Sequence, residues 1–377
     1  MRKRAAARTV DVTIPGDGID MSPRHRPVRV LQSFPYKIGA ARICTTAWHQ
    51  AAGVAAAGAD VLVMPSVVHK PLPAGVRVRT TLARGRVRIP YRVLGHSRAL
   101  ALHDRIVARA LRRIADGIDI VHVWPMAALE TIGVARRLGI PTVLERPSAH
   151  TRFAFATVQR ECERLGVSLP ADHEHAFNAD TLRREEREFA LADRLLCPSD
   201  FVVRSFLDEG FASERLARHI YGYDDATYHP PAQPRVRGEG LRVLFVGVCA
   251  VRKGLHFALD AWLRSPASRT GRFLVAGEFL PVVCGEALAS GCVPLVSDAA
   301  SAACRDRDNA LVHAVGDVDA LSAHFSELDA DRDLLDRLAD RGLGTAPEFT
   351  WTAAGTRLVE VYEEVVARHA GPRRVAA

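Results

Sequence analysis

The residues with the clearest capacity for chemistry surround a short basic loop in the second half of the chain. The run Phe245-Val-Gly-Val-Cys-Ala-Val-Arg-Lys-Gly predicts a strand that ends at Gly247, then Arg252 and Lys253 at the mouth of a helix over Lys253–Arg264. The backbone N–H groups of a helix start, together with two cations, would stabilise a phosphate oxyanion. Glycine-lysine patterns are common, so a solvated basic turn is an equal alternative for this loop taken alone.

A second candidate is an acidic residue further along the chain. The run Gly285-Glu-Ala-Leu-Ala-Ser-Gly predicts a short helix that begins near Glu286 and is broken by Gly291. A buried strand over Cys292–Ser297 follows directly. The basic loop and this helix are more informative as a pair than alone, because their order along the chain is part of the pattern considered below.

The elements that must position these residues alternate between short apolar strands and helical stretches from Val28 onward. Such alternation is typical of parallel βαβ units and predicts an α/β fold. Apolar side chains near a 3.6-residue period over Arg98–Ala115 predict a helix that lies on the sheet. The predicted strands are Arg29–Ser33, Ala59–Met64, Ile118–Val123, Pro141–Glu145, Asp193–Cys197, Leu241–Gly247, Gly271–Gly277 and Cys292–Ser297.

A break in this pattern divides the chain in two. Three prolines in the run Tyr228-His-Pro-Pro-Ala-Gln-Pro mark a linker, and 377 residues exceed what one hydrophobic core usually organises. We predict two Rossmann-like, doubly wound domains over residues 28–230 and 238–368, preceded by a disordered arm over residues 1–27. Sheets of this kind bind ligands in a cleft at the carboxyl ends of their strands.

The composition narrows the classes of protein. A hydrophobic share of 48% and a charged share of 25% are those of a soluble globular protein. No apolar run reaches the ~20 residues that cross a bilayer, and the segment after Met1–Arg8 lacks a signal-peptide core, so we expect a cytoplasmic location. The seven cysteines are scattered without zinc-site spacing, which predicts reduced thiols and no metal site.

The formal net charge of +8 suits anionic partners such as nucleoside diphosphates, acidic lipid head groups or nucleic acid. Nucleic acid is set aside because aromatic residues make up only 6% of the chain and no base-reading motif is present. Redox chemistry is set aside because no strand is followed by Gly-x-Gly-x-x-Gly. The densest basic run, Val76–Ile89, alternates arginine with apolar residues and predicts a half-exposed strand with a solvated face. The alternative is a membrane or acceptor surface.

The basic loop and Glu286 together resemble the carboxyl-terminal domain of the GT-B retaining glycosyltransferases, in particular family 4 (group 1). Lys253-Gly matches the end of the family's Gly-Arg-x-x-x-x-Lys-Gly loop, which holds the donor diphosphate. Gly247 and Arg252 complete this set of donor-binding candidates. Glu286 matches the second glutamate of the family's Glu-x7-Glu element, which binds the donor ribose hydroxyls. Further matches, such as Glu348-Phe-Thr-Trp-Thr, extend the likeness over both domains.

Three candidates in the first domain come from the same resemblance. His150 follows a strand where the family often places a histidine near the reacting sugar, which makes it the catalytic candidate; the alternative is a structural histidine. His122 follows another strand and is an acceptor-side candidate, with a buried strand-end role as its alternative. Gly39 resembles the family's acceptor loop, although Ala40 stands where a second glycine is common, so a plain turn is its alternative.

The resemblance implies an enzyme that moves a hexose-type sugar from a nucleotide-sugar donor, UDP- or GDP-linked, to a hydroxyl group with retention. The acceptor would be a glycan, a lipid or a small molecule. No metal and no further cofactor is implied, because cations and a helix start would neutralise the leaving diphosphate. The expected location is the cytoplasm, with peripheral contact at the inner membrane face.

This sequence departs from the family pattern in the second domain. Val248 occupies the place of the family's first phosphate-binding arginine. Members of the family carry a further βα unit between the strand near Gly277 and the helix of Glu286, whereas here the connection is short. Glu278 has the Glu-x7-Glu spacing but reads as an ordinary residue after a strand. We therefore expect a shortened second sheet with a partly open nucleobase pocket, and the alternative function is a catalytically impaired GT-B remnant that acts in binding.

Overall fold

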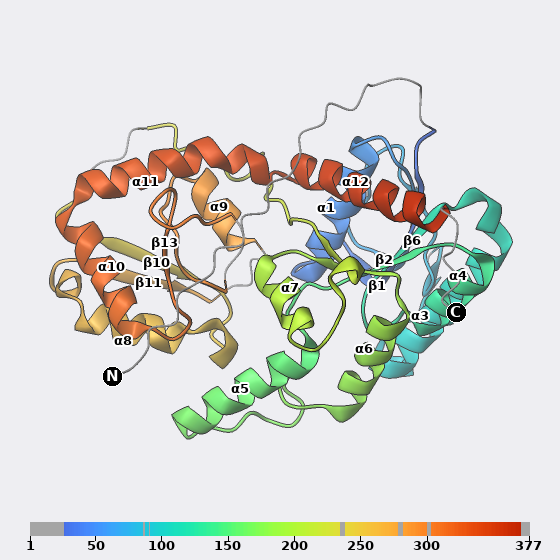
Figure 1. Cartoon of the computed structure of the whole chain (residues 1–377), viewed down its shortest axis with the longest axis horizontal. Coiled ribbons are helices and arrows are strands. Elements are labelled where there is room, and N and C mark those ends of the chain that lie inside the picture. The colour runs from blue at the N-terminus through green and yellow to red at the C-terminus, as the bar shows by residue number, and fades with distance from the viewer. Residues whose placement is uncertain are drawn as a thin grey trace.

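The computed structural model of the chain describes residues 26–85, 87–89, 91–233, 238–277, 282–299 and 303–370. Its first half, up to residue 233, is built on a seven-stranded parallel sheet of order β3-β2-β1-β6-β7-β8-β9 (Figure 1). The strands are β1 (Arg29–Ile38), β2 (Asp60–Val68), β3 (Arg77–Val78), β6 (Ile120–Val123), β7 (Thr142–Glu145), β8 (Arg194–Cys197) and β9 (Leu216–Arg218). The five apolar strands predicted in this half are all present.

The centre of this sheet is buried on both faces. Val30 of β1 pairs with Val61 of β2 on one side and with Ile120 of β6 on the other. Successive side chains of a strand point to opposite faces, and both Val30 and Leu31 have no exposed surface. Parallel crossovers place helices on each face, which explains the run of buried residues in β1.

Helices form the two layers around the sheet. They are α1 (Ile43–Ala56), α2 (Tyr91–Leu94), α3 (His96–Ile114), α4 (Leu129–Leu138), α5 (Thr151–Leu165), α6 (Ala179–Leu191) and α7 (Asp200–Leu207). The helix predicted from periodicity is α3, and it buries Val107 and Leu111 against the sheet. One core lies between the sheet and α3, α4, α6 and α7, and the other lies on the α1 face.

The prediction for the basic run Val76–Ile89 is wrong. Instead of one half-exposed strand over Val76–Ile89, the chain forms three short pieces: β3, then β4 (Ala83–Arg84) and β5 (Val87–Arg88). β4 and β5 pair antiparallel with each other, apart from the large sheet. β3 is an edge strand with both residues exposed, so its arginine stands in water.

The second half, from residue 238, has much less sheet. Within its described residues the strands form two separate parallel pairs, β10 with β11 and β12 with β13, which confirms a shortened second domain. Glu278 lies outside the described residues. The elements are β10 (Arg242–Val246), η3 (Val251–Lys253), α8 (Leu255–Arg264), β11 (Arg272–Ala276), α9 (Val283–Ala289), β12 (Leu295–Ser297), β13 (Leu311–His313), α10 (Val318–Ala330) and α11 (Arg332–Thr345).

The last helix, α12 (Trp351–Ala370), returns to the first half and lies along α1 (Figure 1). The two helices touch at glycines: a Cβ on Gly355 would lie 2.3 Å from the carbonyl oxygen of Gly53. Residues 351–370 therefore complete the core of the first half, although we had assigned 351–368 to the second domain. The boundaries at residues 230 and 238 stay a prediction, and residues 1–25 lie outside the described chain.

Candidate functional site: a basic turn facing a buried carboxyl

Gly247, Arg252 and Lys253 lie between a strand and the following helix, as predicted from the sequence. β10 ends at Val246, and Gly247 follows with a φ of +151°, a backbone conformation that residues with a side chain rarely adopt. The turn η3 then carries Arg252 and Lys253, and Gly254, at a φ of +71°, begins α8. The glycines on either side thus allow the chain to turn sharply and to present two cations beside a helix start.

These two cations are held close together and partly out of water. Burial lowers the pKa of Arg252, and burial together with the charge of Arg252 lowers the pKa of Lys253. Two neighbouring cations repel each other, so an anion placed between them would be stabilised strongly. Glu174 of the first half acts on both in the opposite direction.

Glu286 stands in the first turn of α9, as predicted, and it is only 9% exposed. Burial and the neighbouring Cys284 raise the pKa of its carboxyl to about 7. Among the described residues, its Oε2 atom is buried without a hydrogen-bond partner. A buried acceptor atom without a partner is costly and indicates a place where a ligand hydroxyl could donate.

The basic turn and the carboxyl belong to one neighbourhood. The charge of Cys284 acts both on Lys253 and on Glu286. The structure therefore brings together donor candidates that lie far apart in sequence, while their part in binding a donor stays a prediction.

Sequence analysis missed the contribution of the first half to this neighbourhood. Burial and the charge of Arg252 lower the pKa of His175 to about 4, so His175 and the adjacent Glu174 lie near the basic turn. These residues belong to the non-helical segment between α5 and α6, which has no periodicity and no motif. Only the fold brings it to the turn, so no sequence signal could have identified it.

A second contact joins the two halves beside the basic turn. Nε2 of His256 on α8 lies 2.7 Å from Oε1 of Glu161 on α5. The guanidinium of Arg164 lies over the ring of Phe257, 5.1 Å from its centroid. α5 and α8 therefore hold the basic turn against the first half.

His150 has a structural environment in this chain. It caps the start of α5, where its Nδ1 accepts from the backbone N–H of Arg152 at 3.3 Å. It is 2% exposed and packs against the rings of Phe189 and Phe206, and burial with the charge of Arg146 lowers its pKa to about 4. This geometry suits the structural alternative, and the catalytic role stays a prediction.

His122 lies inside a buried polar network, which suits the strand-end alternative, and its acceptor-side role stays a prediction. Its Nδ1 lies 2.6 Å from the hydroxyl of Tyr362 on α12, and its Nε2 lies 3.4 Å from Oε2 of Glu145. Glu145 also accepts from Tyr221 at 2.8 Å and lies 3.0 Å from Nε2 of His219. Because His122 has no exposed surface, an acceptor does not reach it in this structure.

Gly39 occupies a position that requires glycine. It has a φ of +78°, and a Cβ there would lie 2.5 Å from the Cβ of Lys70 and 3.1 Å from the ring of Trp48. The ammonium of Lys70 lies 3.8 Å from the centroid of that ring. The close packing explains the glycine by itself, and the acceptor-side role of Gly39 stays a prediction.

Comparison with known proteins supports the family resemblance. Residues 44–221 match the model of Glycosyltransferase Family 4. Comparison with curated proteins gives no match.

Solved structures resemble the whole described fold. Sucrose-phosphate synthase from Thermosynechococcus elongatus gives a TM-score of 0.62 at 16% identity, covering 91% of this chain and 100% of that chain. HepE from Anabaena in complex with UDP-glucose gives 0.56 at 13% identity, covering 90% and 100%. The catalytic domain of Starch Synthase IV from Arabidopsis thaliana, bound to ADP and acarbose, gives 0.57 at 11% identity, covering 91% and 99%. At these identities the likeness establishes the fold, which is the GT-B fold.

Proposed function

Because residues 44–221 match the model of Glycosyltransferase Family 4 and the fold is GT-B, we propose that this chain is a glycosyltransferase that moves a hexose-type sugar from a UDP- or GDP-linked donor to a hydroxyl acceptor with retention. The observation that carries the donor part is the buried, unpartnered Oε2 of Glu286 in the same neighbourhood as Lys253. Of the structural relatives, HepE was solved with UDP-glucose and Starch Synthase IV with ADP.

The proposed reaction assigns each charged group a task. The bond between the anomeric carbon and the donor diphosphate breaks, a bond to the acceptor oxygen forms on the same face, and the acceptor proton passes to the departing diphosphate. Arg252, Lys253 and the start of α8 would stabilise the negative charge that develops on the diphosphate. Glu286 would accept hydrogen bonds from the donor ribose.

Independence from metal and from any further cofactor belongs to this proposal, since the cations of η3 can neutralise the diphosphate. The acceptor would be a glycan, a lipid or a small molecule. The protein would work in the cytoplasm, with peripheral contact at the inner membrane face. None of the helices in the described part of the chain is long and apolar enough to cross a bilayer.

A catalytically impaired binding protein is the second candidate. Val248 in place of a phosphate-binding arginine favours it, as do the two separate strand pairs of the second half. Both features reduce the contacts available to a donor.

A donor screen separates the two candidates. Purified protein is incubated with UDP-glucose, UDP-galactose, UDP-N-acetylglucosamine and GDP-mannose in turn, and hydrolysis and transfer are followed by mass spectrometry. We expect one donor to turn over, and Lys253→Ala to slow that turnover by about 100- to 1,000-fold, as for loss of one group that stabilises transition-state charge.

Arg264→Ala, which removes an exposed arginine paired with Asp260 at the other end of α8, is the matched control and should keep full turnover. Equal background turnover by wild type and Lys253→Ala for every donor would exclude the active enzyme. The impaired binding protein would then remain.

A further inference from the structure

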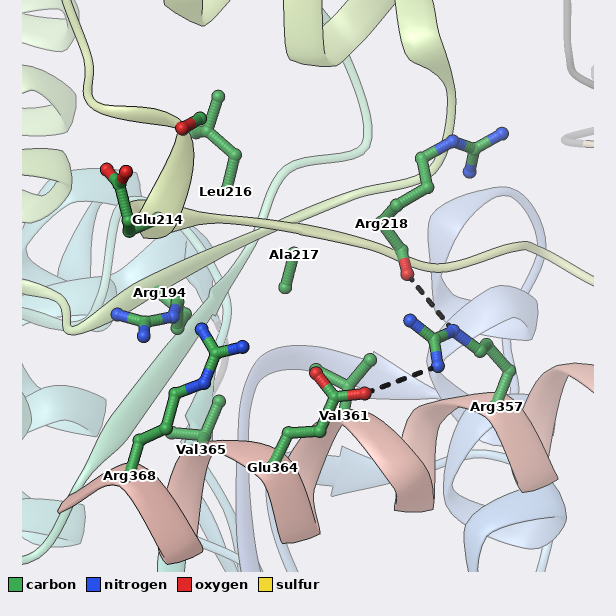
Figure 2. A pocket seen from close by; sticks show the side chains of 11 residues that line it. Arg194, Glu214, Leu216, Ala217, Arg218, Arg357, Val361, Glu364, Val365 and Arg368 are labelled. Carbon is green, nitrogen blue, oxygen red and sulfur yellow. Dashed lines mark hydrogen bonds and ion pairs between the residues drawn. The ribbon is translucent and has the colours of Figure 1, made fainter. Parts of the chain in front are cut away.

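A cavity of about 280 Å³ lies on the first half of the molecule, away from the basic turn. It is formed between β9 and the second half of α12, with Arg194 at the start of β8 on its wall (Figure 2). Its charged lining consists of four arginines and two glutamates: Arg194, Arg218, Arg357, Arg368, Glu214 and Glu364. The cavity therefore carries an excess of positive charge.

Two of these arginines are already neutralised by the protein. Arg218 lies 2.9 Å from Asp200. Arg357 lies 2.9 Å from Glu360 and 3.6 Å from Glu364, and it also donates to the carbonyl oxygen of Arg218 (Figure 2). Their guanidinium groups hold the rim of the cavity in place.

The other two arginines have no carboxylate partner among the described residues. Arg194 donates only to the carbonyl oxygen of Asp193, at 3.1 Å, and Arg368 makes no hydrogen bond or ion pair there. Both side chains line the cavity, and that of Arg368 extends from α12 toward the strand that carries Arg194 (Figure 2). Burial and the charge of Arg368 lower the pKa of Arg194, and the charges of Asp193 and Glu214 offset this only in part. Two cations forced together beside a cavity are stabilised by an anion between them.

We propose that Arg194 and Arg368 form a binding site for a phosphate monoester, separate from the donor site. Arginine suits this ligand because its planar guanidinium makes paired hydrogen bonds to phosphate oxygens. Val361 and Val365 of α12 and Ala217 of β9 supply apolar surface for the carbon part of the ester (Figure 2).

The size of the cavity limits what the site can take. Small-molecule pockets measure roughly 300–1,000 Å³, so this cavity of about 280 Å³ lies just below that range and fits a phosphate with a few carbon atoms rather than a sugar nucleotide. A bound ester would tie α12 to β8. Because α12 enters the first half directly after the second half ends, such a ligand would also fix the point where the two halves join.

The test is calorimetric titration with inorganic phosphate and with glycerol 3-phosphate. All proteins carry Lys253→Ala, so that phosphate held at the basic turn makes the same small contribution in each. We expect binding by this parent, and a loss of about tenfold or more in affinity for the variant that adds Arg194→Gln and Arg368→Gln. Arg341→Gln, which removes an exposed arginine paired with Asp308, is the control and should bind like the parent.

Flotation with phosphatidic acid vesicles identifies the source of the phosphate. Flotation of the parent but not of the double variant assigns the ester to a lipid head group, and soluble binding without flotation assigns it to a free metabolite. No binding by the parent, or equal binding by the double variant, would overturn the site. Circular dichroism melts check that the variants are folded, and the result does not depend on any sugar donor.

Discussion

The strands β1 and β10 both begin with Arg-Val-Leu, yet the leucines have opposite environments. Leu31 has no exposed surface, whereas Leu244 is 58% exposed. The valines behave alike, because Val30 and Val243 each face a hydrophobic core. Helices pack against both faces of the first sheet, whereas in the described part of the second half they pack against one face of the β10-β11 pair. The different exposure of Leu31 and Leu244 shows that burial of a strand residue depends on the layers around the strand and not on the sequence of the strand itself.

The exposed face of the second half extends beyond Leu244. Leu274, its partner on β11, is 48% exposed, and Val275 is 45% exposed. Parallel sheets are normally covered on both faces by crossover helices. Members of the family resembled here carry a further βα unit before the helix of Glu286, and a helix of such a unit is the kind of element that would cover this face.

The largest effect is expected where the first half is most deeply buried, at Glu145. Glu145→Ala should lower the free energy of unfolding by about 3–5 kcal/mol, because His219, Tyr221 and Gln50 would be left buried without their partner. Urea unfolding at pH 7 measures the change. Glu363→Ala, at an exposed position of α12, is the control and should stay within about 0.5 kcal/mol of wild type.

We expect the contribution of Glu145 to the free energy of unfolding to depend on pH. Burial alone would raise the pKa of Glu145, but His219 and His122 hold it well below its ordinary value of 4.5. The carboxylate therefore contributes its full stabilisation above about pH 4.5, and the contribution is lost as the pH falls further. A Glu145→Ala variant whose deficit is as large at pH 3 as at pH 7 would contradict this description of the network.

The next largest effect on the free energy of unfolding is expected at Leu31, in comparison with Leu244. Leu31→Ala should cost about 2–5 kcal/mol, because it leaves a cavity between the sheet and its helices. Leu244→Ala should cost less than about 1 kcal/mol, because more than half of its side chain is already in water. Urea unfolding of both variants measures the difference. Equal losses would mean that the outer face of β10 is covered in solution.

The sequence predicts those parts of the fold that depend on interactions between residues close together in the chain. Runs of β-branched and apolar residues predicted all the main strands, because a buried parallel strand needs such residues wherever it lies. Periodicity predicted α3 for the same local reason. The return of α12 to α1 depends on the contact of Gly53 with Gly355, which lie far apart in sequence and form no local pattern.

The candidate site divides in the same way. Gly247, Lys253 and Glu286 could be selected from motifs, because a phosphate-binding turn and a helix-start acid are local features. Burial of His122 is one of the two alternatives that the sequence leaves open, but its contact with Tyr362, at the other end of the chain, has no local signal. Glu174 and His175 carried no signal because only the meeting of the two halves brings them to the basic turn.

A smaller effect is expected at Glu286 and concerns pH. The pKa of about 7 means that the folded protein holds the proton of Glu286 more tightly than the unfolded chain does. The free energy of unfolding without ligand should therefore decrease as the pH rises from about 4.5 to 7. Affinity for UDP or GDP should rise over the same range, by about fivefold, because an ionised carboxylate is the stronger hydrogen-bond acceptor. Titration at pH 5, 6 and 7.5 measures this.

Glu286→Gln keeps the titration of the ligand phosphates but removes that of the carboxyl, so it is the control for this experiment. Its affinity should change less with pH than that of wild type. The same pH profile in both proteins would place Glu286 outside the donor site.

The smallest effect is expected at the contact between the halves. His256→Ala removes a partly exposed pair with Glu161, and such pairs contribute about 0.2–1 kcal/mol. The melting temperature should therefore fall by only a few degrees at most. A loss as large as that of Leu31→Ala would show that the second half depends on the first for its stability.

Calorimetric titration of wild type and Lys253→Ala with UDP and with GDP tests the central claim most directly, because it requires neither the sugar nor the acceptor to be known. The account predicts that wild type binds one of the two nucleotides and that Lys253→Ala binds it at least about tenfold more weakly. Absence of binding by wild type, or equal binding by the variant, would contradict a donor site at the basic turn.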